Sequence, residues 1–248
     1  MPKTVAHTLA RKKVTAVCRR LRRLYGPVEP PPQGPVLDEL VAAILSQNTS
    51  DANSSAAMEE LERRLGGWES VRRAPAARIA RAIRRAGLSR RKAPRIKAIL
   101  ETIHRQRGEL SLDFLRDTPT AEAAEYLSRF PGVGPKTAAC VLLFACRKPV
   151  LPVDTHVHRV TGRLGLIGPR TDAAKAHEEL ARLVPPRLVL EFHVELIRHG
   201  RTLCLARNPK CQRCPLLDLC PAGFDIMLKY DSPSYGRTSR GSHSPSGK

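Results

Sequence analysis

The sequence predicts an all-α protein, and three observations support this prediction. Apolar residues recur at helical spacing along most of the chain. Glycines and prolines interrupt this pattern at intervals that suit helix ends. No pair of segments alternates polar and apolar residues as the strands of a hairpin would. With 248 residues, the chain is long enough to form one or two compact domains with a sizeable core.

The same pattern assigns each helix in order along the chain. A first helix has an apolar face that ends at Tyr25, and the proline-rich linker Gly26–Pro35 cannot continue it. Gly66 and Gly87 suit the ends of two later helices, and Gly200 suits a helix C-cap. The expected helices after the linker cover about residues 37–45, 54–65, 76–86, 92–106, 120–129, 135–146, 155–164, 172–183 and 187–199. After residue 228 the chain is basic and rich in Ser, Gly and Pro, which predicts a disordered tail.

The charge of the chain indicates a polyanionic partner. Lys and Arg number 43 against 23 Asp and Glu, so the net charge is +20. The basic residues gather in residues 1–23 and 71–100, and neither stretch contains an acid. Such stripes attract nucleic acid because each neutralised phosphate releases counterions. Solvated helix faces are the alternative. An anionic membrane fits less well, because only 4% of residues are aromatic and no basic helix carries a bulky apolar face.

The compartment follows from what the sequence does not contain. No run of 18 apolar residues is present, so we expect no membrane span. The basic N-terminus lacks the apolar stretch and cleavage site of a secretory signal. We therefore expect a cytoplasmic protein that associates with the nucleoid through DNA.

Four of the seven cysteines crowd together near the C-terminus. They are Cys204, Cys211, Cys214 and Cys220, with six, two and five residues between them. In a reducing compartment this crowding predicts a metal centre rather than disulfides. Four thiolates can hold either tetrahedral zinc or a [4Fe–4S] cluster, and the spacing alone does not decide between them. Cys18, Cys140 and Cys146 fall in apolar helical patterns, so we expect them to pack in the core.

The segment FPGVGPKTA, residues 130–138, has the pattern of a helix–hairpin–helix turn. Gly132 and Gly134 permit a tight turn and close backbone approach, and Pro135 suits the first position of a helix. The backbone amides around Gly132, Val133 and Gly134 are therefore expected to hold a DNA phosphate at the positive end of the helix. An ordinary interhelical turn would explain a bare Gly-x-Gly, but the wider LSRFPGVGPKTA context is more specific.

Two residues near this turn have the chemistry of a covalent catalyst. Lys136 lies at the positive start of an apolar helix, and both surroundings disfavour its ammonium form. A neutral amine can attack the sugar carbon that carries a base and form a Schiff base. Asp154, in LPVDTHVHRV, can assist, although an aspartate before a helix is also a favoured N-cap. A charged, phosphate-binding lysine is the alternative role for Lys136. His156 and His158 are candidates for phosphate contacts, and the alternative is that these histidines are only packed or solvated.

FPGVGPKTA, LPVDTHVHRV and the four cysteines follow one another in this order, and together they resemble the endonuclease III family of DNA glycosylases over roughly residues 10–222. The resemblance implies two helical domains with a DNA-binding groove between them. It implies a six-helix domain with the hairpin at residues 29–148, and a discontinuous cluster domain at residues 1–28 and 149–225. Residues 226–248 would form the basic tail. The cysteines would hold a [4Fe–4S] cluster that orders a DNA-contacting loop.

The resemblance also implies roles for single residues. Lys136 matches the lysine that attacks C1′, and Asp154 matches the aspartate that assists this attack and later proton transfers. Residues 44–51 match the helix end that projects a residue into the gap left by a flipped base. The best-known members carry glutamine where this chain has Asn48, so either Asn48 or Gln47 takes that role. Leu88 matches the leucine that wedges opposite the lesion.

A lysine at position 136 implies a bifunctional reaction: base loss, a Schiff base and strand nicking by β-elimination. We expect a monomer that removes oxidised or reduced pyrimidines from duplex DNA and also acts on abasic sites. A uracil or thymine mismatch glycosylase of the same superfamily is one alternative. A non-catalytic DNA-binding protein whose cluster senses redox state is another. Pro135 departs from the basic residue that many relatives carry.

Overall fold

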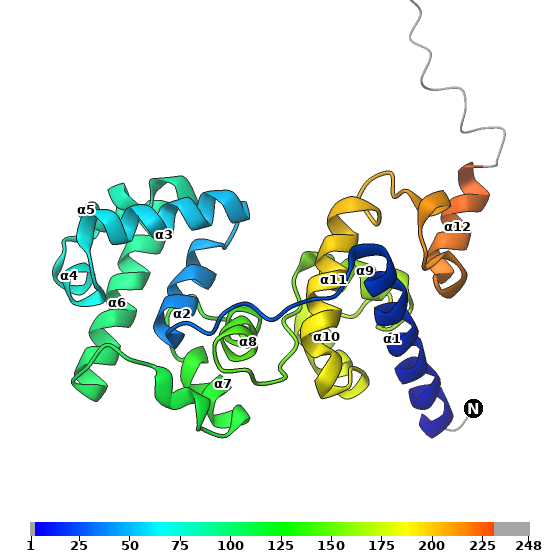
Figure 1. The fold of residues 1–248 in the computed structure, drawn as a ribbon, viewed down its shortest axis with the longest axis horizontal. Helices are drawn as coiled ribbons and strands as arrows, with labels where there is room; N and C mark the ends of the chain where they lie inside the picture. The colour runs from blue at the N-terminus through cyan, green and yellow to red at the C-terminus, as the bar shows by residue number, and fades with distance from the viewer. Residues whose placement is uncertain (1–2, 231–248) are drawn as a thin grey trace, which may run out of the picture. The chain divides into compact units, whose positions relative to one another are not determined.

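The computed structural model describes residues 3–230, and the described residues form helices and connecting segments without a strand (Figure 1). The all-α prediction is confirmed. None of the helices in this described part is long and apolar enough to cross a membrane.

The chain divides into two compact units, each of which has its own buried residues. We call residues Glu29–Asp154 and Pro185–Leu190 the hairpin unit. The cluster unit consists of the remaining three segments, of which residues 3–28, 155–184 and 191–230 are described. The first division, after Val28, coincides with the expected one. The second falls after Asp154 rather than after residue 148, because Val150 packs against the core of the hairpin unit.

The hairpin unit contains most of the helices. These are α2 (Val36–Leu45), α3 (Asp51–Leu65), α4 (Trp68–Arg73), α5 (Ala76–Ala82), α6 (Ser89–Arg107), α7 (Thr120–Ser128) and α8 (Pro135–Phe144), with short 3-10 turns η1 (Arg84–Ala86), η2 (Asp113–Arg116) and η3 (Pro186–Leu188). The sequence pattern predicted six helices here and missed α4. That helix spans six residues and buries only Val71, so it is too short to show an apolar period.

The core of the hairpin unit explains why α8 is apolar on every side. All residues of α8 from Thr137 to Leu143 are buried. Buried side chains of α2, α3, α6 and α7 complete this core, among them Leu40, Leu61, Ile99 and Leu127. The prediction of a central, buried helix after Lys136 is therefore confirmed, and the start of α8 is held rigidly by its own packing.

The cluster unit packs around two long helices. Its elements are α1 (Lys3–Tyr25), α9 (Thr155–Arg163), α10 (Ala173–Leu183), α11 (Val189–Thr202), η4 (Cys211–Arg213), η5 (Leu217–Leu219) and α12 (Pro221–Tyr230), with the first two residues of α11 counted in the hairpin unit. Val17 and Leu21 of α1, with Phe192 and Leu196 of α11, are fully buried. A single apolar face on each helix therefore holds this unit together.

Two predictions for the cluster unit were wrong. Gly200 is not a C-cap, because α11 continues to Thr202. A Cβ on Gly200 would lie 2.8 Å from Nδ1 of His156, so glycine is needed there for close packing. The expected tail from residue 226 is also incorrect, since α12 extends to Tyr230. Residues 231–248, the rest of that tail, lie outside the described residues.

Candidate functional site

The turn between α7 and α8 requires one glycine and leaves open space at the other. Gly132 has φ 78°, a left-handed conformation, and a Cβ there would lie 2.9 Å from Nη1 of Arg95. Gly134 has φ −91°, and no atom lies within 4 Å of the position that its Cβ would take. No side chain caps α8. The positive end of α8 is therefore open to a negatively charged ligand beside Gly134.

Val133 holds the turn to the core of the hairpin unit. Its side chain is buried in the core of the hairpin unit, and its amide N–H donates to the carbonyl of Phe130 at 3.1 Å. This hydrogen bond closes the turn, and the phosphate contact of Val133 stays a prediction. Val133 fastens the hairpin to the core, and this anchoring holds the two glycines in place.

The charged groups of Lys136, Glu39 and Asp154 all act electrostatically on the thiol of Cys140. Lys136 is half-buried and forms a hydrogen bond with this thiol. Burial raises the pKa of Cys140, the charge of Lys136 opposes that shift, and the carboxylates of Glu39 and Asp154 add to it. These residues come from α2, from α8 and from the segment before α9, all within the hairpin unit. The predicted lysine and aspartate therefore both lie within electrostatic range of one thiol.

Glu39 is a member of this site that the sequence analysis missed. It lies on α2 between the buried residues Leu37 and Leu40 and is itself half-buried. Burial raises the pKa of its carboxyl group to about 7, and the positive charge of Lys136 limits the rise. The sequence signal that could have predicted this residue is a glutamate next to the apolar face of a helix. The site thus holds a second carboxyl group, that of Glu39, and this group changes charge near neutral pH.

Gln47 and Asn48, the two candidates for the gap-filling residue, lie in different surroundings. Nε2 of Gln47 donates to the carbonyl of Gly132 at 3.0 Å and to Oγ1 of Thr137 at 3.2 Å. This amide therefore ties the end of α2 to the hairpin. Asn48 is exposed, and its φ of 54° is left-handed. The side chain of Asn48 faces solvent, whereas Gln47 braces the turn.

Leu88 is displayed on a tight loop between η1 and α6. It is 48% exposed, which is unusual for a leucine next to a helix that buries six of its residues. Gly87 has φ 65° and Leu88 has φ 48°, so two successive residues are left-handed. A leucine in this conformation costs about 1–3 kcal/mol, and such strain is typical of functional sites. The loop therefore presents an apolar side chain to whatever binds here.

Lys92 belongs to the predicted basic stripe but does not contribute to a charged surface. Only 1% of it is exposed, and its Nζ donates to the carbonyls of Leu45 and Ala86, each at 2.7 Å. Burial lowers the pKa of this amine. The two carbonyls end α2 and η1. Lys92 therefore clamps together the two elements that lead to Asn48 and Leu88.

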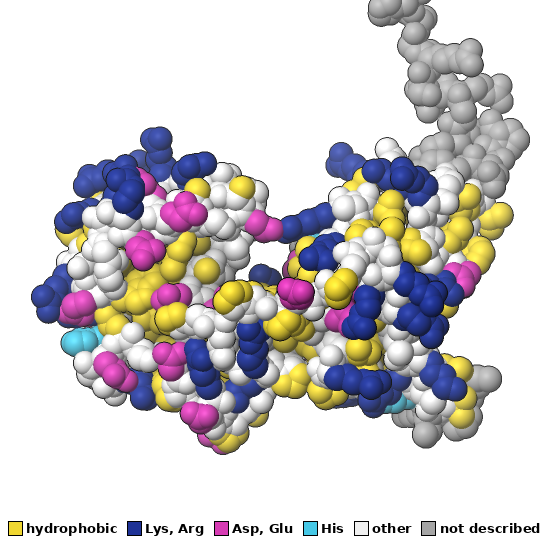
Figure 2. All heavy atoms as spheres, in the orientation of Figure 1, with side chains coloured by type: hydrophobic (Ala, Val, Ile, Leu, Met, Phe, Trp, Pro, Cys, Tyr) yellow, Lys and Arg dark blue, Asp and Glu magenta, His cyan; other side chains and the backbone are white. Residues whose placement is uncertain are grey.

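Acidic neighbours divide the rest of the stripe at residues 71–100. Arg72 and Arg73 pair with Glu69, and Lys97 pairs with Glu101, so acids just outside the stripe neutralise part of it. The arginines that are exposed and form no salt bridge with any described residue are Arg78, Arg81, Arg84, Arg85, Arg90 and Arg91. Figure 2 shows Lys and Arg side chains gathered over α3 and α5. This narrower surface, rather than the whole stripe, is the electrostatic footprint for a polyanion.

The four C-terminal cysteines come together in the cluster unit. All four line one cavity, and none forms a disulfide. Burial, followed by the negative charge of the other three thiolates, raises the pKa of Cys214 to about 11. A polynuclear cation would remove that repulsion. Nη1 of Arg163 donates to Sγ of Cys204 at 3.2 Å, and Nε2 of His199 lies 3.5 Å from Sγ of Cys214. Four convergent thiols with such neighbours fit an iron–sulfur cluster.

His156 is held in a defined orientation near this centre. It is half-buried on α9, and Nη2 of Arg159 lies 3.1 Å from its Nδ1. Because a guanidinium can only donate, Nδ1 accepts and the ring proton is on Nε2. Arg159 also donates to the carbonyls of Gly200 and Cys204. The predicted DNA contact of His156 therefore has a hydrogen-bond donor to offer.

The predicted packing of the remaining cysteines is confirmed. Cys18, Cys140 and Cys146 are buried, and all three thiols are free. Cys140 and Cys146 belong to the hairpin unit, and Cys18 belongs to the cluster unit.

Two regions of the chain match described families. Residues 41–186 match the HhH-GPD superfamily of base excision DNA repair proteins. Residues 204–220, which include all four clustered cysteines, match the iron–sulfur binding domain of endonuclease III. Together these matches include the hairpin turn, Lys136, Asp154 and the four clustered cysteines.

Individual relatives agree with these matches. The chain is 34% identical to endonuclease III of Sulfolobus acidocaldarius over 194 residues, 77% of this chain and 83% of that protein. It is 40% identical over 166 residues to an Arabidopsis thaliana protein that is provisionally named a DNA glycosylase, and 31% identical over 170 residues to the DNA glycosylase/AP lyase ROS1 of the same plant. The first of these alignments covers 67% of this chain and 57% of the plant protein. The second covers 62% of this chain and only 12% of ROS1, so the chain spans a part of each of these longer proteins.

The fold also matches solved structures. A non-covalent endonuclease III–DNA complex superposes with a TM-score of 0.76 at 26% identity, covering 88% of this chain and 98% of that protein chain. A thermostable thymine-DNA glycosylase, at 24% identity and a TM-score of 0.71, covers 86% of this chain and 98% of its own, and shares the fold.

Proposed function

Since the chain belongs to the HhH-GPD superfamily of base excision DNA repair glycosylases, and within it to the endonuclease III family with its [4Fe–4S] cluster, we propose that it is a bifunctional DNA glycosylase and AP lyase. Its substrates are oxidised or reduced pyrimidines in duplex DNA, and abasic sites. The protein works as a monomer in the cytoplasm, on the nucleoid.

One observation carries this proposal. The half-buried amine of Lys136 lies at the open start of α8, and the carboxylate of Asp154 acts electrostatically on the same Cys140 thiol as this amine. A mismatch glycosylase that only hydrolyses the glycosidic bond does not need an amine at this position. A DNA-binding protein without chemistry does not need the amine and the carboxylate to converge. The lysine therefore favours the bifunctional reaction over both alternatives.

The reaction that these groups support begins at C1′ of a flipped nucleotide. The lone pair of the Lys136 amine forms a bond to C1′ while the bond from C1′ to the base breaks, and the base leaves with that electron pair and takes up a proton. The sugar ring opens to a Schiff base. A proton then leaves C2′, the bond from C3′ to its phosphate oxygen breaks, and the strand is nicked 3′ to the lesion. Water finally releases the amine, and Asp154 exchanges the protons.

The remaining residues position the DNA. Gly134 and the positive end of α8 bind a phosphate, and Asn48 and Leu88 fill the space that a flipped nucleotide leaves. His156 donates from Nε2 to a phosphate oxygen. Cys204, Cys211, Cys214 and Cys220 hold the cluster, which supplies structural order to the segment between α11 and α12.

Borohydride trapping tests the proposal, because it reduces a Schiff base to a stable covalent adduct. The cluster-loaded protein is incubated with duplexes that contain thymine glycol, an abasic site, a G·U pair, a G·T pair or no lesion. We expect an adduct and a nicked strand with thymine glycol and the abasic site. Lys136→Ala should reduce the adduct to background while DNA affinity changes by less than about tenfold.

The matched control is Lys148→Ala, which removes another partly buried lysine of the hairpin unit. This variant should trap DNA as well as the unchanged protein. An undiminished adduct in Lys136→Ala would place the nucleophile elsewhere. Base release from G·U or G·T without any adduct would instead support the mismatch glycosylase.

A further inference from the structure

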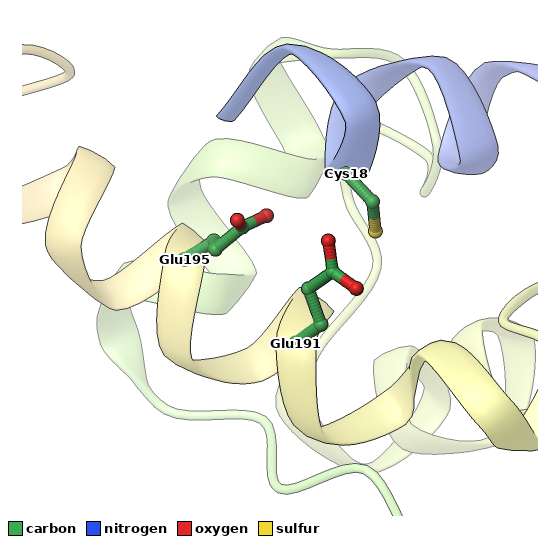
Figure 3. A group of neighbouring side chains, drawn as sticks. All are labelled: Cys18, Glu191 and Glu195. Carbon is green, nitrogen blue, oxygen red and sulfur yellow. The ribbon is translucent and has the colours of Figure 1, made fainter. Parts of the chain in front are cut away.

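Three side chains that no step above uses meet inside the cluster unit. Cys18 of α1 faces Glu191 and Glu195 of α11, and their sulfur and oxygen atoms all lie within 4.8 Å of one another. Figure 3 shows the three side chains directed toward one another. All are buried, with exposures of 2%, 8% and 0%. The two glutamates are four residues apart, a spacing that places both on one face of a helix.

Glu195 is the unexplained member of this group. Both of its carboxylate oxygens are buried, and neither has a hydrogen-bond partner among the described residues. Burial, followed by the negative charge of Glu191, raises the pKa of Glu195 to about 8. Arg22 donates from Nε and Nη2 to Glu191, but it makes no hydrogen bond to Glu195. A buried carboxylate without a hydrogen-bond partner is costly, and a cation bound beside Glu195 would offset that cost.

We propose that Cys18, Glu191 and Glu195 form a structural zinc site that joins α1 to α11. This site is separate from the four cysteines of the iron–sulfur cluster. The two helices supply one sulfur and two carboxylate ligands, and the fourth position of a tetrahedral ion is open to water.

A divalent ion balances the charges at this site. A thiolate and two carboxylates carry three negative charges, and one Zn²⁺ together with the guanidinium of Arg22 balances them. Arg22 then remains on one oxygen of Glu191 while the other oxygen binds the metal. The side chain of Arg22 is 57% exposed, so it can shift with little loss of packing.

The donor set selects zinc over harder cations. A thiolate is a soft ligand that Mg²⁺ and Ca²⁺ avoid, and Ca²⁺ needs at least about six oxygen ligands. Zinc ligands in a tetrahedral site lie about 3.5 Å from one another. The present separations of up to 4.8 Å therefore need a contraction of about 1 Å, which glutamate rotamers can supply.

Metal analysis of the cluster-loaded protein tests the proposal directly. The protein is first shown to contain four iron atoms and four sulfides per chain, so that the cluster cysteines are occupied. It is then equilibrated with Zn²⁺ in the presence of a competing chromophoric chelator. We expect one zinc per chain and a melting temperature that rises with zinc. Cys18→Val and Glu195→Gln should each lose the zinc, with an affinity at least about a hundredfold lower.

Cys146→Val is the matched control, because it removes a buried cysteine from the hairpin unit. It should retain one zinc per chain. If a variant does not fold, zinc uptake and the melting temperature of the unchanged protein still test the proposal. No zinc uptake and no zinc-dependent melting temperature with an intact cluster would overturn the proposal and leave Glu195 as a buried neutral acid. Retention of the zinc by folded Cys18→Val would overturn it as well.

Discussion

Two lysines of the hairpin unit lie in the first turns of their helices, yet their surroundings give them opposite roles. Lys92 of α6 is 1% exposed, and its amine is bonded to two main-chain carbonyls, each at 2.7 Å. Lys136 of α8 is half-buried beside the Cys140 thiol, with the carboxyl groups of Glu39 and Asp154 nearby. The first amine is enclosed by the core, and the second can be reached by a ligand at Gly134.

Burial alone does not make a lysine a nucleophile. Burial lowers the pKa of the Lys92 amine, because it disfavours the charged form. A reactive amine also needs access to substrate and a neighbour that exchanges protons. Lys92 has neither, and it instead satisfies carbonyls at two helix ends that would otherwise be unpaired. The carboxylate of Asp154 acts electrostatically on the Cys140 thiol that also interacts with Lys136. The start of α8, beside Gly134, is open to a ligand.

We expect Asp154→Asn to have the largest effect, and this effect is on the rate of base release. Asparagine caps helices about as well as aspartate, so the fold should be preserved. It cannot accept a proton, however, and single-turnover base release should fall by about 10²–10⁴-fold. Rapid-quench kinetics on a thymine glycol duplex measure this rate, and thermal melting checks the fold. A loss below about tenfold would remove Asp154 from the proton transfers and leave Lys136 without its partner.

A smaller effect, on stability rather than on chemistry, is expected from Lys92→Met. Methionine fills a similar volume but leaves the carbonyls of Leu45 and Ala86 unpaired in the core. The free energy of unfolding should fall by about 3 kcal/mol, since each unsatisfied buried group costs about 1–3 kcal/mol. Denaturant titration measures the loss. Borohydride trapping on an abasic site should persist at temperatures where the variant is folded.

Lys97→Met is the control for that change, because Lys97 also bonds a carbonyl, that of Arg72, but is only partly buried. Its removal should cost less than about 1 kcal/mol. If folded Lys92→Met failed to trap DNA, Lys92 would be part of the chemistry and the distinction between the two lysines would break down.

The smallest effect concerns Glu39 and the pH dependence of stability. The pKa of Glu39 is raised from 4.5 to about 7, so between these values the folded protein holds a proton that the unfolded chain has released. Stability therefore falls as pH rises through this window. Glu39→Gln should remove this loss, which amounts to about 1 kcal/mol after allowance for partial exposure.

Chemical denaturation at pH 4.5, 6 and 7.5 measures the slope for both proteins. Glu59→Gln, at an exposed position of α3, should leave the slope unchanged. An equal slope in Glu39→Gln and the unchanged protein would show that Lys136 has no titrating neighbour on α2.

The apolar period of the helices predicted the fold class, and three motifs predicted the family, the iron–sulfur cluster and the candidate residues Lys136 and Asp154. The reason is that this information is local: Pro135 begins α8, Gly132 makes the turn, and four cysteines crowd into one short segment. Helices of ordinary length were also predictable from their apolar period, whereas the short α4 was not.

Contacts between segments far apart in the sequence were decided only by the tertiary structure. Lys92 looked like one more surface charge until Leu45, 47 residues away, supplied its carbonyl. Gln47 and Asn48 were equivalent candidates until the carbonyl of Gly132 engaged one of them. Glu195 meets Cys18 in the same way. Residue spacing encodes which helix face a side chain occupies, but the partner on that face comes from another helix, and only packing determines which one.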